Sequence, residues 1–63
     1  MKEFKAGDKV TFDKGYGSGH GIVKSKAGEN HYFVVYHWDD KPDEYANYTA
    51  ERTFIEYLYE GWI

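Results

Sequence analysis

Polar and apolar side chains alternate from Gly7 to Phe12, which places Val10 and Phe12 on the same side of an extended chain. This period of two predicts a half-buried strand that carries both residues inward. Residues 13–19 follow as a predicted loop. Glycine stands at every second position from Gly15 to Gly21, which leaves the backbone free to adopt positive φ angles.

Two apolar runs further along the chain predict a hairpin. Residues 21–25 have the pattern of a short strand and residues 27–30 that of a turn. Residues 31–38 form the strongest strand signal, because nearly all of them are aromatic or β-branched. One side of this strand carries Tyr32, Val34, Tyr36 and Trp38, and the other carries Phe33, Val35 and His37. We therefore expect a strand covered on both sides, or one with an exposed aromatic side.

The last third of the chain allows two interpretations. The polar segment 39–44 contains the single proline and predicts a hairpin connection, followed by a fourth strand at 45–48. Residues 49–52 then predict a turn and residues 53–58 a fifth strand, so that five strands can close on themselves. The alternative is a helix from Ala50 toward Gly61 with Thr49 as its N-cap.

Composition favours one small β domain over residues 1–63. The chain has no cysteine and 21% aromatic residues, which favours sheet over helix and excludes disulfides and thiolate metal sites. No apolar stretch has the length of a membrane span or a signal peptide. We therefore expect a cytoplasmic protein with no membrane partner.

Charge is distributed unevenly along the chain. The net charge is −3, but residues 1–26 hold six lysines against three carboxylates, and the remaining residues carry −6. Overall acidity argues against sequence-independent binding to phosphate backbones, which depends on clustered Lys and Arg. A local basic face remains compatible with the sequence.

A set of turn and packing residues occurs in an order that resembles the small SH3-like barrels, with Tudor and KOW modules as the nearest named groups. The residues are Gly7, Asp8, Val10, Gly19, Gly21, Ile22, Val23, Trp38, Asp39 and Asp40. The resemblance extends from Gly7 to about Leu58 and implies an all-β, five-stranded SH3-like small barrel, with a short C-terminal helix as the alternative. These positions concern packing and turns, so they leave the function open.

An enzymatic alternative follows from the same resemblance. A plasmid-type dihydrofolate reductase built on this barrel also opens with Gly-Asp-(Arg/Lys)-Val, and its site is made by a Val-Gln-Ile-Tyr segment at the centre of a tetramer. This chain contains no glutamine. We therefore expect no enzyme, and keep an oligomeric small-molecule-binding barrel as the second alternative function.

Residues 15–21 and the histidines are the candidates for catalytic or metal chemistry. The glycine spacing matches neither the Rossmann nor the Walker phosphate loop. His31 and His37 would lie about 20 Å apart on one strand, too far to share a metal. The carboxylates of residues 39–44 lack the EF-hand pattern. We expect no catalytic residue, no metal site and no cofactor.

Aromatic and acidic residues instead predict a protein interface. Seven tyrosines and two tryptophans exceed what the core of 63 residues can enclose. Carboxylates beside Trp38 and Tyr45 would steer a basic surface, which would then bury an aromatic anchor. We predict a non-enzymatic protein-binding module, or a small inhibitor, that docks on a larger basic protein. The predicted binding residues are Tyr16, His20, Tyr36, Trp38, Asp39, Asp40, Asp43, Glu44, Tyr45 and Tyr48.

The first alternative function is a nucleic-acid-binding module of KOW or Tudor type. It would use the lysines of the first half with Tyr16 as a stacking surface. These lysines are Lys9, Lys14, Lys24 and Lys26.

Overall fold

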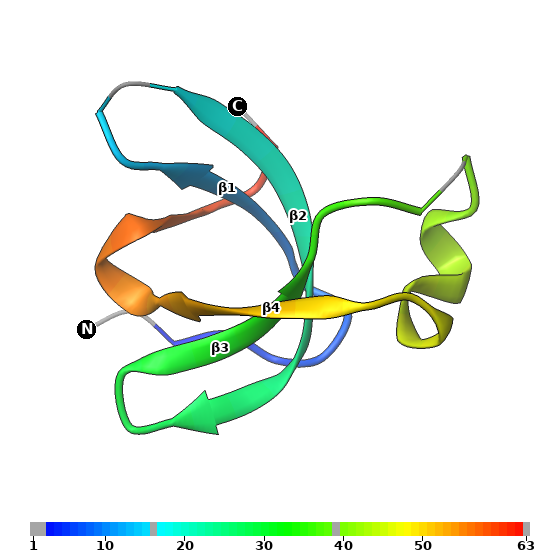
Figure 1. Ribbon diagram of the computed structural model, residues 1–63, viewed down its shortest axis with the longest axis horizontal. Helices are drawn as coiled ribbons and strands as arrows, with labels where there is room; N and C mark the ends of the chain where they lie inside the picture. The colour runs from blue at the N-terminus through cyan, green and yellow to red at the C-terminus, as the bar shows by residue number, and fades with distance from the viewer. Residues whose placement is uncertain (1–2, 16, 39, 63) are drawn as a thin grey trace.

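The computed structural model describes residues 3–15, 17–38 and 40–62, which form a five-stranded antiparallel sheet (Figure 1). The strands are β1 (Lys9–Asp13), β2 (Ser18–Gly28), β3 (His31–Val35), β4 (Ala50–Phe54) and β5 (Leu58–Glu60), in the spatial order β4-β3-β2-β1-β5. Two 3-10 helices, η1 (Pro42–Asn47) and η2 (Ile55–Tyr57), lie on either side of β4 in the chain. The prediction of a small all-β fold with five strands is confirmed.

The long strand β2 gives the sheet its curvature. Its residues 18–22 pair with β1 and its residues 22–28 pair with β3. The register shifts twice along the second half, and such irregularities bend a strand and increase its twist. The loop predicted at residues 13–19 is shorter than expected, because β2 already begins at Ser18, which pairs with Asp13 at the end of β1.

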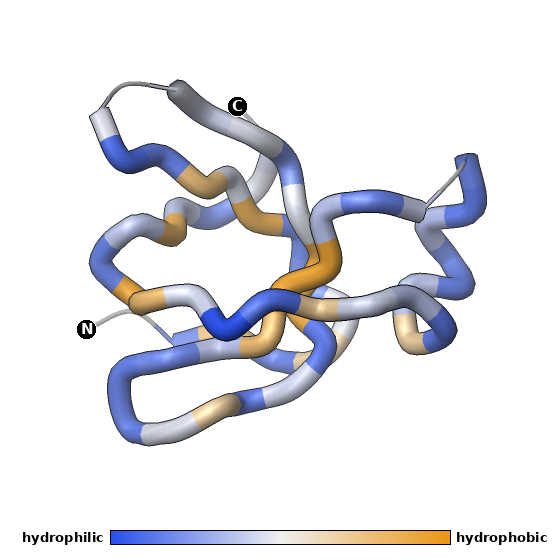
Figure 2. The backbone as a smooth tube through the Cα atoms, in the orientation of Figure 1, coloured by the Kyte–Doolittle hydropathy of each residue, from blue (hydrophilic) through white to orange (hydrophobic). Residues whose placement is uncertain are grey.

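The core lies on the inner side of this curved sheet. It contains Phe4, Val10, Val23, Tyr32, Val34 and Leu58, with Phe12, Tyr36 and Ile55 packed against it. Of the two residues predicted to point inward, Val10 is buried and Phe12 is partly buried against the core. Val23 and Val34 are fully buried beside Val10, and Figure 2 shows apolar backbone positions gathered where the strands cross. On β3, Val35 is also buried whereas Phe33 remains 38% exposed, so only part of the second side is covered.

The predicted fourth strand at 45–48 is wrong. β3 ends at Val35, and residues 45–47 belong to η1. Pro42 stands at the start of this helix, where its fixed φ angle is compatible with helical geometry and its missing N–H is not needed. The chain enters η1 after Asp40, whose φ of 65° is a left-handed conformation that Asp tolerates better than most residues.

The prediction for residues 49–58 is also corrected. Residues 50–54 form β4 where a turn was expected, and η2 separates β4 from β5, so neither a continuous strand at 53–58 nor a helix toward Gly61 forms. The reason is topological. β4 pairs with β3 and β5 pairs with β1, which lie on different sides of β2. One straight strand cannot pair with both, and the turn of η2 redirects the chain between them.

Candidate partner-binding surfaces

The end of the described chain folds back over β1 and β2. The Gly61 N–H donates to the carbonyl oxygen of Lys9 at 2.9 Å, and the Thr11 hydroxyl donates to the carbonyl oxygen of Gly61 at 2.7 Å. Gly61 has a φ of 77°, a conformation that glycine adopts without steric cost. The chain turns here, so Trp62 reaches β2. Its indole N–H donates to the carbonyl oxygen of Gly21 at 2.9 Å.

Two rings lie parallel to the ring of Trp62, and together they form a surface that we call the indole stack: His20, Trp38 and Trp62. The ring centroids of Trp38 and Trp62 are 5.5 Å apart with 3° between the planes. For His20 and Trp62 the values are 5.3 Å and 10°. Trp62 is 36% exposed and Trp38 is half-buried, so neither indole belongs to the core.

A cation lies beside the stack. The ammonium of Lys9 is 4.9 Å from the centroid of the Trp62 ring, within the range of a cation–π interaction. With the N–H of Trp62 bonded to Gly21, the ring is held both at its edge and across its face. The ring of Trp62 is therefore fixed in orientation, while 36% of the residue stays exposed.

A polar segment projects from the sheet next to Trp38, and we call residues 40–48 the acidic arm (Figures 1 and 2). Its carboxylates Asp40, Asp43 and Glu44 are exposed. The Lys41 N–H donates to the carbonyl oxygen of Trp38 at 2.7 Å, which joins the arm directly to the stack. The Lys41 ammonium is 3.9 Å from the Glu44 carboxylate, an exposed ion pair of small energetic weight.

Two tyrosines hold the arm against the body of the protein. Tyr45 lies against Gly7, where an added Cβ would be 3.4 Å from the Tyr45 hydroxyl oxygen. The ammonium of Lys24 donates to the carbonyl oxygen of Tyr48 at 3.3 Å. Both tyrosines are half-buried, so Tyr45 and Tyr48 position the arm and offer less free surface than the sequence suggested.

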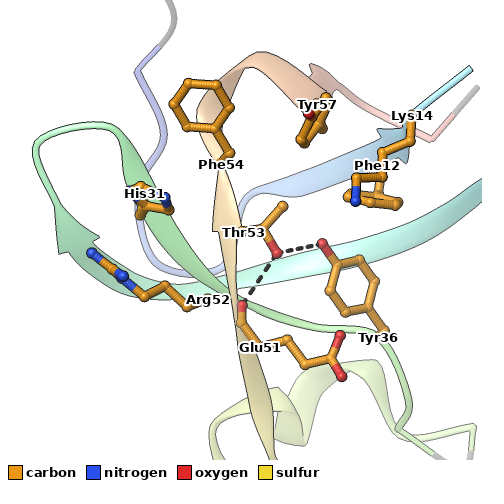
Figure 3. Close-up of a pocket in the computed structure, with 9 residues that line it drawn as sticks. All are labelled: Phe12, Lys14, His31, Tyr36, Glu51, Arg52, Thr53, Phe54 and Tyr57. Carbon is orange, nitrogen blue, oxygen red and sulfur yellow. Dashed lines mark hydrogen bonds between the residues drawn. The ribbon is translucent and has the colours of Figure 1, made fainter.

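A separate groove lies beside β4 (Figure 3) and has a volume of about 370 Å³. Its lining residues are Phe12, Lys14, His31, Tyr36, Glu51, Arg52, Thr53, Phe54 and Tyr57. The ring of Tyr57 contacts those of Phe12 and Phe54 edge to face, at centroid distances of 6.0 and 5.7 Å. The Lys14 ammonium lies 5.3 Å from the Tyr57 ring centroid.

Tyr36 forms the polar end of this groove. Its hydroxyl shares a hydrogen bond of 2.7 Å with the Thr53 hydroxyl, in which either oxygen could be the donor. The Thr53 hydroxyl is 3.2 Å from the Glu51 carbonyl oxygen, to which it donates when it accepts from Tyr36. Burial raises the pKa of Tyr36 above its ordinary value of 10.0, and the hydrogen bond with Thr53 opposes this shift without reversing it. Tyr36 is therefore neutral at physiological pH.

The structure distributes the predicted binding residues over three places. His20 and Trp38 meet in the indole stack, the acidic arm carries Asp40, Asp43, Glu44, Tyr45 and Tyr48, and Tyr36 lines the groove. Tyr16 and Asp39 lie outside the described residues. Trp62, the centre of the stack, is missing from the predicted set. Its signal in the sequence was only the excess of aromatic residues, since nothing local connects it to His20.

Among residues 3–15, 17–38 and 40–62, no three His, Asp or Glu side chains are placed to hold a metal ion together. None of the helices found there has the length and apolar character needed to cross a membrane.

No protein-family model, curated protein or solved structure matches this chain.

Proposed function

We propose that this protein is a non-enzymatic protein-binding module of the SH3-like type, in which the indole stack anchors a partner and the acidic arm steers that partner's basic surface. The observation that carries the proposal is the parallel packing of Trp38 and Trp62 outside the core, at 5.5 Å. The five-stranded, strongly bent antiparallel sheet supports the resemblance to small SH3-like barrels.

The indole stack has the properties of a binding anchor. Tryptophan is enriched among the residues that dominate binding energy at protein interfaces. The ring of Trp62 is already held by its hydrogen bond to Gly21 and by the Lys9 ammonium. The free-energy cost of ordering this side chain when a partner binds is therefore small. A half-exposed and rigid aromatic surface therefore favours a recognition role over simple packing.

The acidic arm adds charge complementarity. Asp40, Asp43 and Glu44 are exposed and share the arm with a single described cation, Lys41. Negative charge concentrated on a projecting segment attracts basic surfaces over a distance of about one Debye length, about 8 Å at physiological salt. Since the arm is hydrogen-bonded to Trp38, a basic surface drawn to the arm arrives next to the stack.

The same features make nucleic acid the weaker alternative. A stacking platform for bases needs positive charge along the backbone path, whereas the indole stack has Lys9 on one ring and the acidic arm beside it. The four lysines that the sequence suggested do not gather in one place. Lys9 lies over the Trp62 ring, Lys14 lines the β4 groove, Lys26 lines a pocket with Glu3 and Glu29, and Lys24 is bonded to Tyr48.

Affinity capture from an extract of the cells that produce the protein tests this proposal. The immobilised wild type is compared with the arm variant Asp40→Asn, Asp43→Asn, Glu44→Gln. The matched control carries Glu3→Gln, Glu29→Gln and Glu60→Gln, three exposed carboxylates outside the arm. We expect one basic protein to be retained by the wild type and the control but lost by the arm variant, with nuclease treatment having no effect. Retention that nuclease abolishes would contradict the proposal.

A further inference from the structure

The groove beside β4 follows the free edge of that strand. Four consecutive residues of β4, 51–54, line it. Successive side chains of a strand point to opposite faces of the sheet, so a groove that contacts all four runs along an edge. β3 occupies one edge of β4, and no strand among the described residues pairs with the other.

The hydrogen-bond pattern between β3 and β4 leaves main-chain groups of every second β4 residue directed toward this groove. The Ile55 N–H donates to the Asn30 carbonyl oxygen at 2.8 Å, which marks these two as a hydrogen-bonded pair. In an antiparallel ladder such pairs alternate with pairs whose N–H and C=O groups point outward. Because His31 pairs with Phe54 and Phe33 with Arg52, the N–H and C=O of Arg52 and the N–H of Phe54 point away from β3. Phe54 is the N-cap of η2, and its carbonyl oxygen accepts the first hydrogen bond of that helix.

The two sides of the groove differ in chemistry (Figure 3). On one side of β4 lie the aromatic rings of Phe12, Tyr36 and Tyr57, together with Lys14 and the Glu51 carboxylate, and on the other lie Arg52, His31 and the ring of Phe54. A strand added along the edge would point every second side chain to each side. The side with the three rings accepts apolar side chains and, because it also holds the Glu51 carboxylate, disfavours acidic ones. The side with the Arg52 guanidinium accepts carboxylates.

We propose that β4 binds an extended acidic segment of a protein by strand addition, with alternating apolar and acidic side chains on its two sides. Main-chain hydrogen bonds to an exposed sheet edge supply affinity in this mode of recognition, and the pockets for alternate side chains supply specificity. This site uses no residue of the indole stack or the acidic arm, and its ligand has the opposite charge. It therefore stands whether or not those surfaces bind a basic partner.

A titration of the uniformly ¹⁵N-labelled full chain tests this proposal. The probe is a short synthetic peptide, capped at both ends, in which glutamates alternate with valine, phenylalanine and valine. We expect the largest amide shifts at Arg52 and Phe54. The peptide of equal length with lysine in place of glutamate should bind the wild type at least about threefold more weakly than the acidic peptide does, and Arg52→Glu should weaken binding of the acidic peptide by a similar factor. Lys5→Glu, an equal charge change at an exposed site outside the groove, should bind the acidic peptide like the wild type.

Two further peptides separate strand addition from side-chain binding alone. Both keep the acidic sequence, and each carries N-methyl groups on one of the two sets of alternate residues. Only one set has its N–H groups toward β4, so we expect one methylated peptide to lose binding and the other to keep it. Equal binding of both methylated peptides and the unmodified peptide would overturn the proposal, as would equal binding of the acidic and basic peptides or shifts confined to residues outside the groove. Pairing of β4 with a second copy of the chain, seen as a dimer mass in the absence of peptide, would overturn it as well.

Discussion

The indole N–H of Trp62 donates a hydrogen bond of 2.9 Å to the carbonyl oxygen of Gly21, residues that are 41 positions apart in the sequence. This bond ties the chain after β5 to β2, although the strand between them in the sheet is β1. Gly21 thus contributes to both sides of the sheet. Its carbonyl orients the exposed stack, and its missing side chain leaves room for the core.

The space at Gly21 gives the first prediction. A Cβ added there would lie 2.5 Å from Cγ1 of Val34 and 3.1 Å from the Tyr36 ring, so Gly21→Ala forces core residues to move. We expect a loss of about 1–3 kcal/mol of unfolding free energy, as for other overpacked cores, measured by urea denaturation. Gly19→Ala is the matched control on the same strand, because an added Cβ meets nothing within 4 Å there. Equal stability of both variants would contradict this packing.

The buried valines give a second prediction. Val10, Val23 and Val34 are fully buried in one cluster, so each Val→Ala change removes apolar contacts and leaves a small cavity. We expect each to lower the unfolding free energy by about 1–3 kcal/mol, a large part of the roughly 5 kcal/mol expected for a domain of this size. Thermal and urea unfolding measure this loss. Wild-type stability in all three variants would show that the core is misplaced.

Sequence patterns predicted the first three strands because their signals are local. Alternation around Val10, the run at 31–38 and the turn between the second and third strands are visible within a few residues. The positions of β4 and β5 depend on which strand each pairs with. Thr53 and Phe54 favour a strand at either position, and only the separate pairing of β4 with β3 and β5 with β1 decides where the chain must turn.

The candidate site could likewise be predicted from the sequence only in part. Composition indicated that tyrosine and tryptophan must reach the surface, and Tyr59 and Trp62 are indeed 43% and 36% exposed. The sequence could not indicate that His20, Trp38 and Trp62 meet, because this depends on the turn at Gly61 and on the end of β3 at Val35. The groove beside β4 could not be predicted from the sequence either, since its lining residues come from several separate segments of the chain.

The raised pKa of Tyr36 gives a third prediction, on alkaline stability. Its cause is first of all burial. Above the ordinary tyrosine pKa of about 10 the unfolded chain releases this proton while the folded protein still holds it, so the folded state loses relative stability as pH rises. We expect the stability advantage of the wild type over Tyr36→Phe to shrink between about pH 8 and pH 10.5.

Urea denaturation of both proteins at the two pH values measures this difference. The other tyrosines are common to both proteins and cancel in the comparison. At about pH 8 the wild type should be more stable by about 1 kcal/mol, the contribution of one hydrogen bond to Thr53. A difference in unfolding free energy between the two proteins that stays constant or grows with pH would show that folding does not protect Tyr36 from ionisation.

The acidic arm gives a fourth prediction, once the partner is purified. Neutralising Asp40, Asp43 and Glu44 together should mainly slow association and reduce its dependence on salt, because exposed charges act on the approach of the partner. Trp38→Ala should instead speed dissociation and weaken affinity by at least about 2 kcal/mol if this indole is a hot spot. Surface plasmon resonance at two salt concentrations separates the two effects. Melting temperatures should first show that both variants are folded.

Site-specific photo-crosslinking reports which surface of the protein touches the partner, so it tests the proposed binding face itself. A benzoylphenylalanine placed at Asp43 in the acidic arm is compared with one at Glu29 in the turn between β2 and β3, both exposed positions. We expect irradiation in an extract of the producing cells to join one basic protein to the arm position alone, and Trp38→Ala to abolish this product. Crosslinking of that protein from Glu29 with none from Asp43, or crosslinking of the arm to nucleic acid, would contradict this expectation.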